Sequence, residues 1–314
     1  FLIYLKDQIC QKLNLIALPK KGSFHKKKSF LIGGLILITS FIFNHFFLII
    51  NEFNFFYLNF LLVVSFFGIA FVDDIYNISP YQKIFYCTLF LLLALYLDNT
   101  LTIRTIKSYY FDLFYFPNSK FVKYFFPILC VLLLVNAFNF IDGINGLAGT
   151  VGLSIVLYLV VKNIDLINHI FLIIIFLILF LYFNFKKSFF LGDSGNYLIS
   201  AIISSIILKE NYLDPHMYYV EEIFLLLLIP GLDMLRLFIE RISNKKNPLY
   251  GDNNHLHHIL FYKFGLLKTL MIYLLLINIP LYIYFFTQKY IAIIILLTAI
   301  IYFFLINKKV FKII

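Results

Sequence analysis

Long apolar runs separated by short polar segments dominate this chain of 314 residues. A helix needs roughly 20 apolar residues to cross a bilayer core about 30 Å thick. Runs of about this length predict ten membrane-spanning helices, at 31–50, 53–72, 83–97, 121–141, 147–162, 166–183, 195–208, 220–239, 266–286 and 290–306. We therefore expect an all-α fold, a polytopic transmembrane helical bundle that forms a single domain over 1–314.

Composition supports a membrane protein, because hydrophobic residues make up 62% of the chain and charged residues only 13%. Soluble domains carry about a quarter charged residues. The chain begins at Phe1 and shows no signal-peptide pattern. From this start we expect a truncated N-terminus, and an eleventh span in the full-length protein.

The distribution of basic residues predicts the orientation of the bundle. The net charge of +10 is compatible with nucleic acid, with an anionic membrane surface or with anionic substrates. Most Lys and Arg residues fall in loops on one side of the expected spans, and the positive-inside rule makes that side cytoplasmic. Because these residues are spread over many short loops, the pattern argues against a nucleic-acid partner.

Four polar clusters interrupt the apolar pattern, and all lie at the expected cytoplasmic ends of spans. They are FVDDIYNISP at 71–80, NAFNFIDGINGLAG at 136–149, FNFKKSFFLGDSGNY at 183–197 and NPLYGDNNHLHHIL at 247–260. Polar groups gathered on one face of a membrane protein point to a functional site there. Loops are polar in general, but the expected outer loops hold no comparable cluster.

The acidic and amide residues of the first three clusters suit a metal and phosphates. Asp73 and Asp74 are adjacent carboxylates that need a cation or a proton to coexist, unless they only end a solvated helix. Asn139 and Asp142 share a helix face, while the Gly-rich stretch after Asp142 suits either a ligand or a tight turn. The sequence around Asp193 is compatible with a role as a metal ligand or as a helix N-cap.

The fourth cluster contains His255, His257 and His258 within four residues. A zinc site and a cradle for phosphate oxygens both need histidines, although no cysteine cluster supports zinc. Together the four clusters indicate metal-assisted phosphoryl transfer, in which the protein mainly positions groups and neutralises charge.

The order D-D, N-x-x-D-G-x-N-G-L-A, F-N…G-D-S-G and P-x-x-x-D-x-x-H-x-H-H resembles the polyprenyl-phosphate N-acetylhexosamine-1-phosphate transferases of glycosyltransferase family 4. The resemblance runs from about His25 to Gly265. It implies a bacterial inner-membrane enzyme with a cytoplasmic site that uses Mg²⁺ or Mn²⁺. The implied reaction transfers N-acetylhexosamine 1-phosphate from a UDP-sugar to undecaprenyl phosphate and releases UMP, and a homodimer is compatible with it.

Matching positions then receive roles by resemblance. The paired acids Asp73 and Asp74 match those that handle lipid phosphate and metal, and Asp193 matches the acid that coordinates Mg²⁺. The resemblance assigns catalysis to Asp73, Asp74, Asp142, His255, His257 and His258, metal binding to Asp74 and Asp193, and substrate binding to Asn139, Asn145, Asn184, Arg241 and Asp252.

The His-x-His-His form is similar to the branch that initiates O-antigen, enterobacterial common antigen and teichoic acid. The chain departs from the family pattern at Phe30, at Lys187 and Ser188, at Asn196 and at Ser200, none of which is a proposed catalytic group. Direct attack by the lipid phosphate is favoured over a covalent phospho-enzyme. The alternative function is an ion-coupled secondary transporter, which would place its acids near the midplane in repeated, broken helices.

Overall fold

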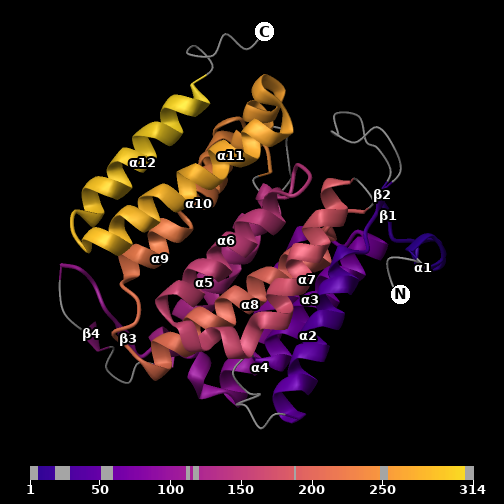
Figure 1. Ribbon diagram of the computed structural model, residues 1–314, viewed down its shortest axis with the longest axis horizontal. Helices are drawn as coiled ribbons and strands as arrows, with labels where there is room; N and C mark the ends of the chain where they lie inside the picture. The colour runs from indigo at the N-terminus through magenta and orange to yellow at the C-terminus, as the bar shows by residue number, and fades with distance from the viewer. Residues whose placement is uncertain are drawn as a thin grey trace.

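The computed structural model describes residues 6–17, 29–50, 59–110, 114–115, 120–186, 189–247 and 254–307. Within these residues the chain is mostly helical, and the helices pack into a bundle with α2 and α3 on one side and α11 and α12 on the other (Figure 1). The α-helices are α1 (Lys6–Lys12), α2 (Gly33–Ile50), α3 (Phe60–Tyr76), α4 (Pro80–Leu97), α5 (Lys120–Ile141), α6 (Leu147–Lys162), α7 (Ile167–Phe185), α8 (Gly192–Leu213), α9 (Val220–Leu226), α10 (Leu228–Ser243), α11 (Leu256–Thr287) and α12 (Ile291–Ile306).

The expected all-α membrane fold is confirmed, because within the described residues each apolar run overlaps a helix. Among the described residues, five helical stretches are long and apolar enough to cross a membrane: Gly33–Ile50, Pro80–Leu97, Val122–Ile141, Ile164–Phe185 and Leu256–Thr287. The helices Leu147–Lys162 and Ile291–Ile306 are apolar but shorter. The number of spans, ten, therefore stays a prediction.

The first acidic pair lies inside a helix, and not after it as the expected span 53–72 implied. The side chain of Asn59 accepts a hydrogen bond from Leu62 N at 2.8 Å and so begins α3 at Phe60. The helix then continues through Asp73 and Asp74 and ends where Asn77 adopts a left-handed conformation, with φ 53°. Residues 51–58 lie outside the part of the chain that the structure describes.

Two other expected spans have different bounds. The run 220–239 forms two helices, α9 and α10, because Pro230 cannot donate a backbone hydrogen bond to the carbonyl of Leu226. The run 266–286 belongs to the longer α11, which bends at Gly265, a residue with φ 74° and ψ 178°. This bend separates the histidine-bearing first segment of α11 from the apolar segment that the sequence predicted.

Helix α8 forms the centre of the bundle, where it packs against α2, α3, α5 and α6. It is longer than the expected span 195–208, and all its residues from Ser194 to Glu210 are buried. The hydroxyl groups of Ser200 and Ser204 each donate to a carbonyl four residues earlier, at 2.7 and 2.8 Å. Helix α8 can therefore carry polar side chains through the interior.

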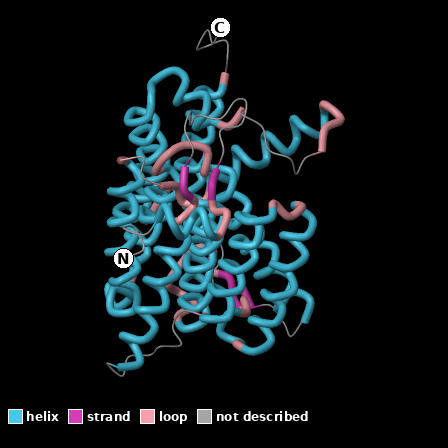
Figure 2. Tube along the Cα trace, turned by 90° about the vertical axis from the view of Figure 1, so that its right-hand side faces the viewer, coloured by secondary structure: helices cyan, strands magenta, loops and turns pink. Residues whose placement is uncertain are grey.

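Two short antiparallel hairpins, which the sequence did not predict, lie at different levels of the bundle (Figure 2). One pairs β1 (Ile16–Ala17) with β2 (Ser29–Phe30), and the other pairs β3 (Thr105–Ile106) with β4 (Phe114–Tyr115). The first hairpin joins the start of α8, because Phe190 N donates to the carbonyl of Phe30 at 2.8 Å.

The end of the bundle near β3 and β4 has buried charges, whereas the sequence suggested no polar cluster there. Lys209 pairs with Asp98 at 3.2 Å, and Lys162 pairs with Glu222 at 3.1 Å. Residues far apart in sequence make these pairs, so the pattern of a single loop could not reveal them.

Candidate active site

The turn between α3 and α4 places basic and acidic side chains together. Ser79 caps α4 by accepting a hydrogen bond from Gln82 N, and Pro80 occupies the first helical position. Because the two helices run in opposite directions from this tight turn, Lys83 in the first turn of α4 faces Asp73 in the last turns of α3. The two side chains form an ion pair.

Lys83 joins this hairpin to the start of α8. Its ammonium also donates to Asp193 Oδ2 at 2.8 Å, so it lies between two acids from different helices. The carboxylate of Asp73 is largely buried, with 10% of its side chain exposed. Lys83 therefore compensates two negative charges that would otherwise repel each other.

Asp74 caps α8 from the neighbouring helix. Its Oδ1 accepts from Asp193 N at 2.9 Å, and its Oδ2 accepts from Ser194 N at 3.1 Å. These backbone donors have no partner within their own helix, and the positive end of the helix dipole favours a carboxylate there. The capping role that the sequence allowed for Asp193 thus belongs to Asp74, and the side chain of Asp193 points to Lys83.

The turn between α5 and α6 contributes Asp142 to the same region. Asn196 of α8 donates to Asp142 Oδ2 at 2.7 Å. Burial, opposed by the Asn196 hydrogen bond and assisted by the charge of Asp193, raises the pKa of Asp142 to about 7. The ionised form of Asp142 is therefore destabilised unless a cation approaches.

These side chains line a cavity of about 820 Å³. Asn184, at the end of α7, is buried and donates to the carbonyl of Phe189 at 2.8 Å, which fixes the loop before α8. The polar residues of the cavity wall come from four helices, α3, α4, α7 and α8, and from the turns after α3 and α5: Asp73, Asp74, Asn77, Lys83, Asp142, Asn145, Asn184 and Asp193. A cavity of this volume, lined by acids and amides, suits a polar ligand with an associated cation.

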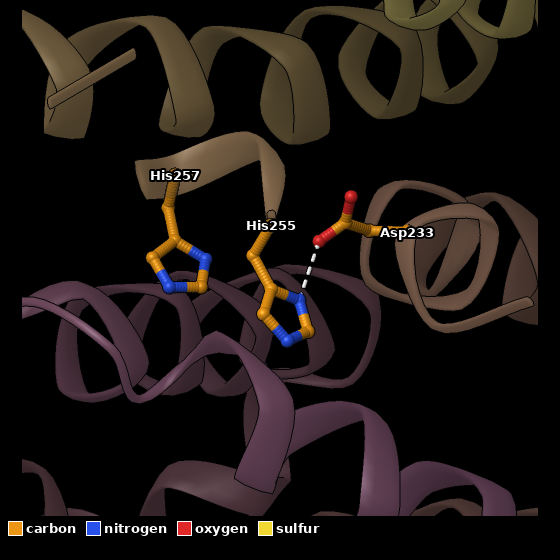
Figure 3. Close-up of side chains that lie close together, drawn as sticks. All are labelled: Asp233, His255 and His257. Atoms are coloured by element: carbon orange, nitrogen blue, oxygen red, sulfur yellow. Dashed lines mark hydrogen bonds and ion pairs between the residues drawn. The ribbon is translucent and has the colours of Figure 1, made fainter. Parts of the chain in front are cut away.

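The three histidines form a second cluster beside this cavity. Asp233 of α10 and His255 are hydrogen-bonded, with 2.9 Å between Oδ2 and Nδ1, and His257 lies next to them (Figure 3). The ring centroids of His257 and His258 are 4.0 Å apart. Asp233, His255 and His257 each offer an atom within 4.8 Å of the others, and no other such group of His, Cys, Asp and Glu is found among the described residues.

Gly143 connects the two clusters. Gly143 lines the cavity, and a Cβ atom added to it would lie 2.0 Å from His257 Nε2. The sequence suggested that the glycines of this turn allow a ligand to approach, but here the close neighbour is a histidine. Neither ring nitrogen of His257 has a hydrogen-bond partner within the described part of the chain, although the side chain is fully buried.

The structure brings most, but not all, of the expected site residues to one cavity. Asp73, Asp74, Asp142, Asn145, Asn184 and Asp193 line it, whereas His255, His257 and His258 lie behind the turn at Gly143. Asn139 is half-buried in the last turn of α5 and is not part of the cavity wall. Arg241 is buried with its guanidinium 5.6 Å from the ring of Phe140. Asp252 lies outside the described residues.

Sequence reasoning missed the roles of Lys83 and Asn196. Lys83 counted only as a basic residue on the cytoplasmic side, yet it is the single charge in the otherwise apolar sequence of α4. Asn196 was noted as a departure from the family pattern, and its partner Asp142 lies 54 residues away. An isolated charge at the start of an apolar helix was the available signal for Lys83.

Comparisons with known proteins identify a family and several relatives of this chain. Residues 56–211 match the family model described as glycosyl transferase family 4. The chain is similar to an undecaprenyl-phosphate alpha-N-acetylglucosaminyl 1-phosphate transferase of Thermotoga maritima, with 30% identity over 216 residues. It is also similar to a probable undecaprenyl-phosphate N-acetylglucosaminyl 1-phosphate transferase of Bacillus subtilis, at 31%, and a decaprenyl-phosphate N-acetylglucosaminephosphotransferase of Mycolicibacterium smegmatis, at 30%.

These matches cover part of each protein. They span 68%, 49% and 40% of this chain and 64%, 45% and 37% of the respective relatives. The chain thus matches less than two thirds of the length of each of these relatives. The matched family segment contains Asp73, Asp74, Lys83, Asp142 and Asp193, which are all the charged residues that line the cavity among those the structure describes.

Proposed function

This chain belongs to glycosyl transferase family 4, and from that premise we propose that it transfers N-acetylhexosamine 1-phosphate from a UDP-sugar to undecaprenyl phosphate. The observation that carries the proposal is a cavity in which four acids and Lys83 of the matched segment meet. A phosphoryl transfer needs such a site to position phosphates and to balance their charge.

In the proposed reaction, a phosphate oxygen of the lipid attacks the β-phosphorus of the UDP-sugar. A new P–O bond joins the lipid phosphate to the sugar phosphate, and the bond between the β-phosphorus and the bridging oxygen breaks. UMP leaves with that oxygen, and the product is a polyprenyl diphosphate that carries the sugar.

The donor set of the cavity fits Mg²⁺, and we assign Asp193 and Asp74 to its binding. Carboxylates are the oxygen ligands that Mg²⁺ prefers, and burial together with the charge of Asp193 raises the pKa of Asp142, so a cation in the cavity would stabilise its ionised form. When bound, Mg²⁺ would neutralise charge on the substrate phosphates. Asp74 already accepts two backbone hydrogen bonds, so it holds Asp193 in place as well.

The contacts of the acids favour direct attack over a covalent intermediate. Asp73 is engaged by Lys83, and both carboxylate oxygens of Asp74 accept hydrogen bonds from α8. A carboxylate nucleophile would have to break these contacts. We propose instead that Asp73 and Lys83 position the lipid phosphate, with Asp73 able to accept its proton.

In this proposal the amide side chains and the histidines bind the donor substrate, the UDP-sugar. Asn145 and Asn184 belong to the cavity wall, and the histidine cluster lies behind Gly143. We assign Asn139, Asn145, Asn184, Arg241 and Asp252 to donor binding, and His255, His257 and His258 to the diphosphate. A movement of the turn at Gly143 would bring the histidines to the cavity.

The proposed membrane arrangement has ten spans in a bacterial inner membrane, with the cavity on the cytoplasmic face and a homodimer as its assembly. The excess of basic residues at that end supports this orientation. The cavity could then receive the donor from the cytosol and the lipid phosphate from the bilayer. The product would initiate a cell-surface polysaccharide.

A transfer assay tests the proposal. Membranes that contain the protein are incubated with undecaprenyl phosphate, Mg²⁺ and radiolabelled UDP-N-acetyl sugars. We expect label in the lipid phase and release of UMP, both abolished by EDTA. Asp193→Asn should lower the rate by at least about a hundredfold, since it removes a charge at the reacting phosphates. The matched control Asp165→Asn changes an exposed acid outside the cavity and should leave the rate unchanged.

Failure of wild-type protein to transfer label from any donor, while it remains folded in the membrane, would contradict the proposal. Ion-coupled transport would then be the function to test. Equal loss of activity in Asp193→Asn and Asp165→Asn would contradict the assignment of the site.

A further inference from the structure

The carboxylate of Asp233 forms hydrogen bonds with several side chains in a buried network that extends to α12. Its Oδ1 accepts from Arg236 Nη2 at 3.0 Å and from the hydroxyl of Tyr302 at 3.0 Å. Its Oδ2 is 2.9 Å from His255 Nδ1. Asp233 and Tyr302 are both buried, so these contacts lie in a region of low polarity where each one is strong.

This network fixes the start of α11, which carries the histidines. The backbone N–H of Leu256 donates to both oxygens of Asp233, at 3.1 and 3.2 Å. Arg236 Nη2 also donates to the carbonyl of Asn254 at 2.7 Å. Asp233 therefore supplies the cap that the side chain of His255 does not supply, and α10 holds the backbone on both sides of His255.

The hydrogen bond to Asp233 also determines which nitrogen of His255 is available. An ionised carboxylate only accepts hydrogen bonds, so Nδ1 must carry the proton. The other nitrogen, Nε2, points away from Asp233 (Figure 3). The ring of His255 also packs near Phe140 of α5, with 5.6 Å between the centroids. Orientation and tautomer of His255 are thus both set by one carboxylate.

A metal ion is the competing occupant of Asp233, His255 and His257, but the donors of this cluster are already engaged. Arg236 places a positive charge 3.0 Å from Asp233 Oδ1, and His255 Nδ1 uses its proton for Oδ2. A divalent cation would have to displace these contacts and lie beside a guanidinium. The geometry favours an orienting network over a metal site.

We propose that Tyr302 of α12 is a positioning residue that acts through Asp233 on His255. This inference rests on the proposed transferase function, in which His255 engages the donor diphosphate. The hydroxyl of Tyr302 donates to Asp233 Oδ1 and accepts from Arg236 Nε at 3.2 Å. It therefore fixes the positions of the carboxylate and the guanidinium relative to each other. Helix α12, which lies outside the segment matched by the family model, thereby supports the histidine motif.

The test uses Tyr302→Phe, which removes one hydroxyl and keeps the ring. We expect kcat for sugar-phosphate transfer to fall about tenfold, because a misplaced catalytic group loses much of its effect. The matched control is Tyr273→Phe. Tyr273 of α11 is also fully buried, but its hydroxyl has no hydrogen-bond partner within the described residues, so kcat should stay within about twofold.

A double-mutant cycle separates positioning from a general structural role. In a His255→Gln background, Tyr302→Phe should change kcat by less than about twofold, because its effect passes through His255. If His255→Gln leaves too little activity, the same cycle is measured on the affinity for the UDP-sugar by calorimetry. Losses that multiply in the double variant would overturn the proposal.

Three further outcomes can be distinguished from one another. Active wild-type protein with equal rates in Tyr302→Phe and Tyr273→Phe would overturn the role of Tyr302 alone. Inactive wild-type protein would overturn the proposed function. One equivalent of zinc in purified protein, lost in Asp233→Asn, would overturn the orienting network in favour of a metal site.

Discussion

At the residue scale, acids of similar appearance in the sequence have different partners in the fold. Asp73 pairs with Lys83, Asp74 caps α8 through backbone N–H groups, and Asp142 accepts from the amide of Asn196. Each partner determines how easily the acid loses its proton and how freely it can move. The adjacent acids Asp73 and Asp74 are therefore not interchangeable.

The raised pKa of Asp142 predicts a pH-dependent requirement for Mg²⁺. Asp142 is protonated below its pKa of about 7 and ionised above it. A cation in the cavity favours the ionised form, so proton and cation compete. We expect the Mg²⁺ concentration that gives half-maximal activity to rise about three- to tenfold between pH 8 and pH 6.

Asn196→Ala is the matched variant for this measurement. The Asn196 hydrogen bond lowers the pKa of Asp142, so its loss should raise that pKa. The increase in Mg²⁺ requirement should then begin at a higher pH than in wild-type protein. A requirement that is the same at pH 6 and pH 8 in both proteins would show that Asp142 and the cation do not interact.

At the element scale, the site depends on how closely helices meet at the start of α8. Gly33 N and Gly34 N of α2 donate to the carbonyls of Phe190 and Leu191, both at 3.0 Å. Asp74 of α3 caps α8 from the other side. The position of Asp193 is therefore set by two helices that precede it by more than a hundred residues.

Gly34→Ala should disturb this meeting point. A Cβ at Gly34 would lie 2.1 Å from Ser194 Oγ and 2.8 Å from Gly195 N, so α2 and α8 would have to separate. Overpacking of this kind costs about 1–3 kcal/mol. We expect a lower midpoint of thermal unfolding in detergent and a transfer rate reduced at least about tenfold, because Asp193 lies next to the displaced residue.

Gly68→Ala provides the control for this prediction. Gly68 lies within α3, and a Cβ there would meet no atom within 4 Å. The added methyl group should leave activity unchanged and slightly favour the helix. Unchanged stability and activity in Gly34→Ala would show that the α2–α8 contact tolerates expansion and does not position Asp193.

At the scale of the whole molecule, the two ends of the bundle differ in how their charges are used. At one end, acids from several helices surround a cavity. At the other end, Lys209 and Asp98, and Lys162 and Glu222, neutralise each other directly. In the part of the chain that the structure describes, the charged residues that line this cavity all belong to one end of the bundle.

Cysteine labelling tests the proposed orientation. Lys246 and Asp165 are both exposed, and they follow α10 and α6 at opposite ends of the bundle. Lys246 marks the cavity end, since its neighbour Asn247 donates to Tyr81 OH in the first turn of α4 at 3.3 Å. In a variant whose native cysteines are replaced by alanine, Asp165→Cys should react with a membrane-impermeant maleimide in intact cells.

Lys246→Cys in the same background should react only after the membrane is opened. The native thiols must be replaced first, because Cys130 is partly accessible whereas Cys10 and Cys87 are buried. The reverse labelling pattern would place the cavity outside the cell and would exclude a cytosolic UDP-sugar as donor.

The sequence by itself determined the class of the protein and the residue types of its site. The length and apolarity of its runs predict spanning helices, because a helix satisfies its own backbone hydrogen bonds wherever it lies in the bilayer. The ordered motifs around Asp73, Asp142, Asp193 and His255 likewise predict the family, since their residues are close in the chain. Local information was sufficient for both.

Only the tertiary structure decided how these residues meet. Lys83 bridges Asp73 and Asp193, Asp74 rather than Asp193 caps α8, and Tyr302 holds Asp233 beside His255. The tertiary structure also decided that the turn at Gly143 separates the histidines from the cavity. These contacts join helices distant in sequence, and their distances depend on how side chains of several helices fill shared space, which no single run of residues encodes.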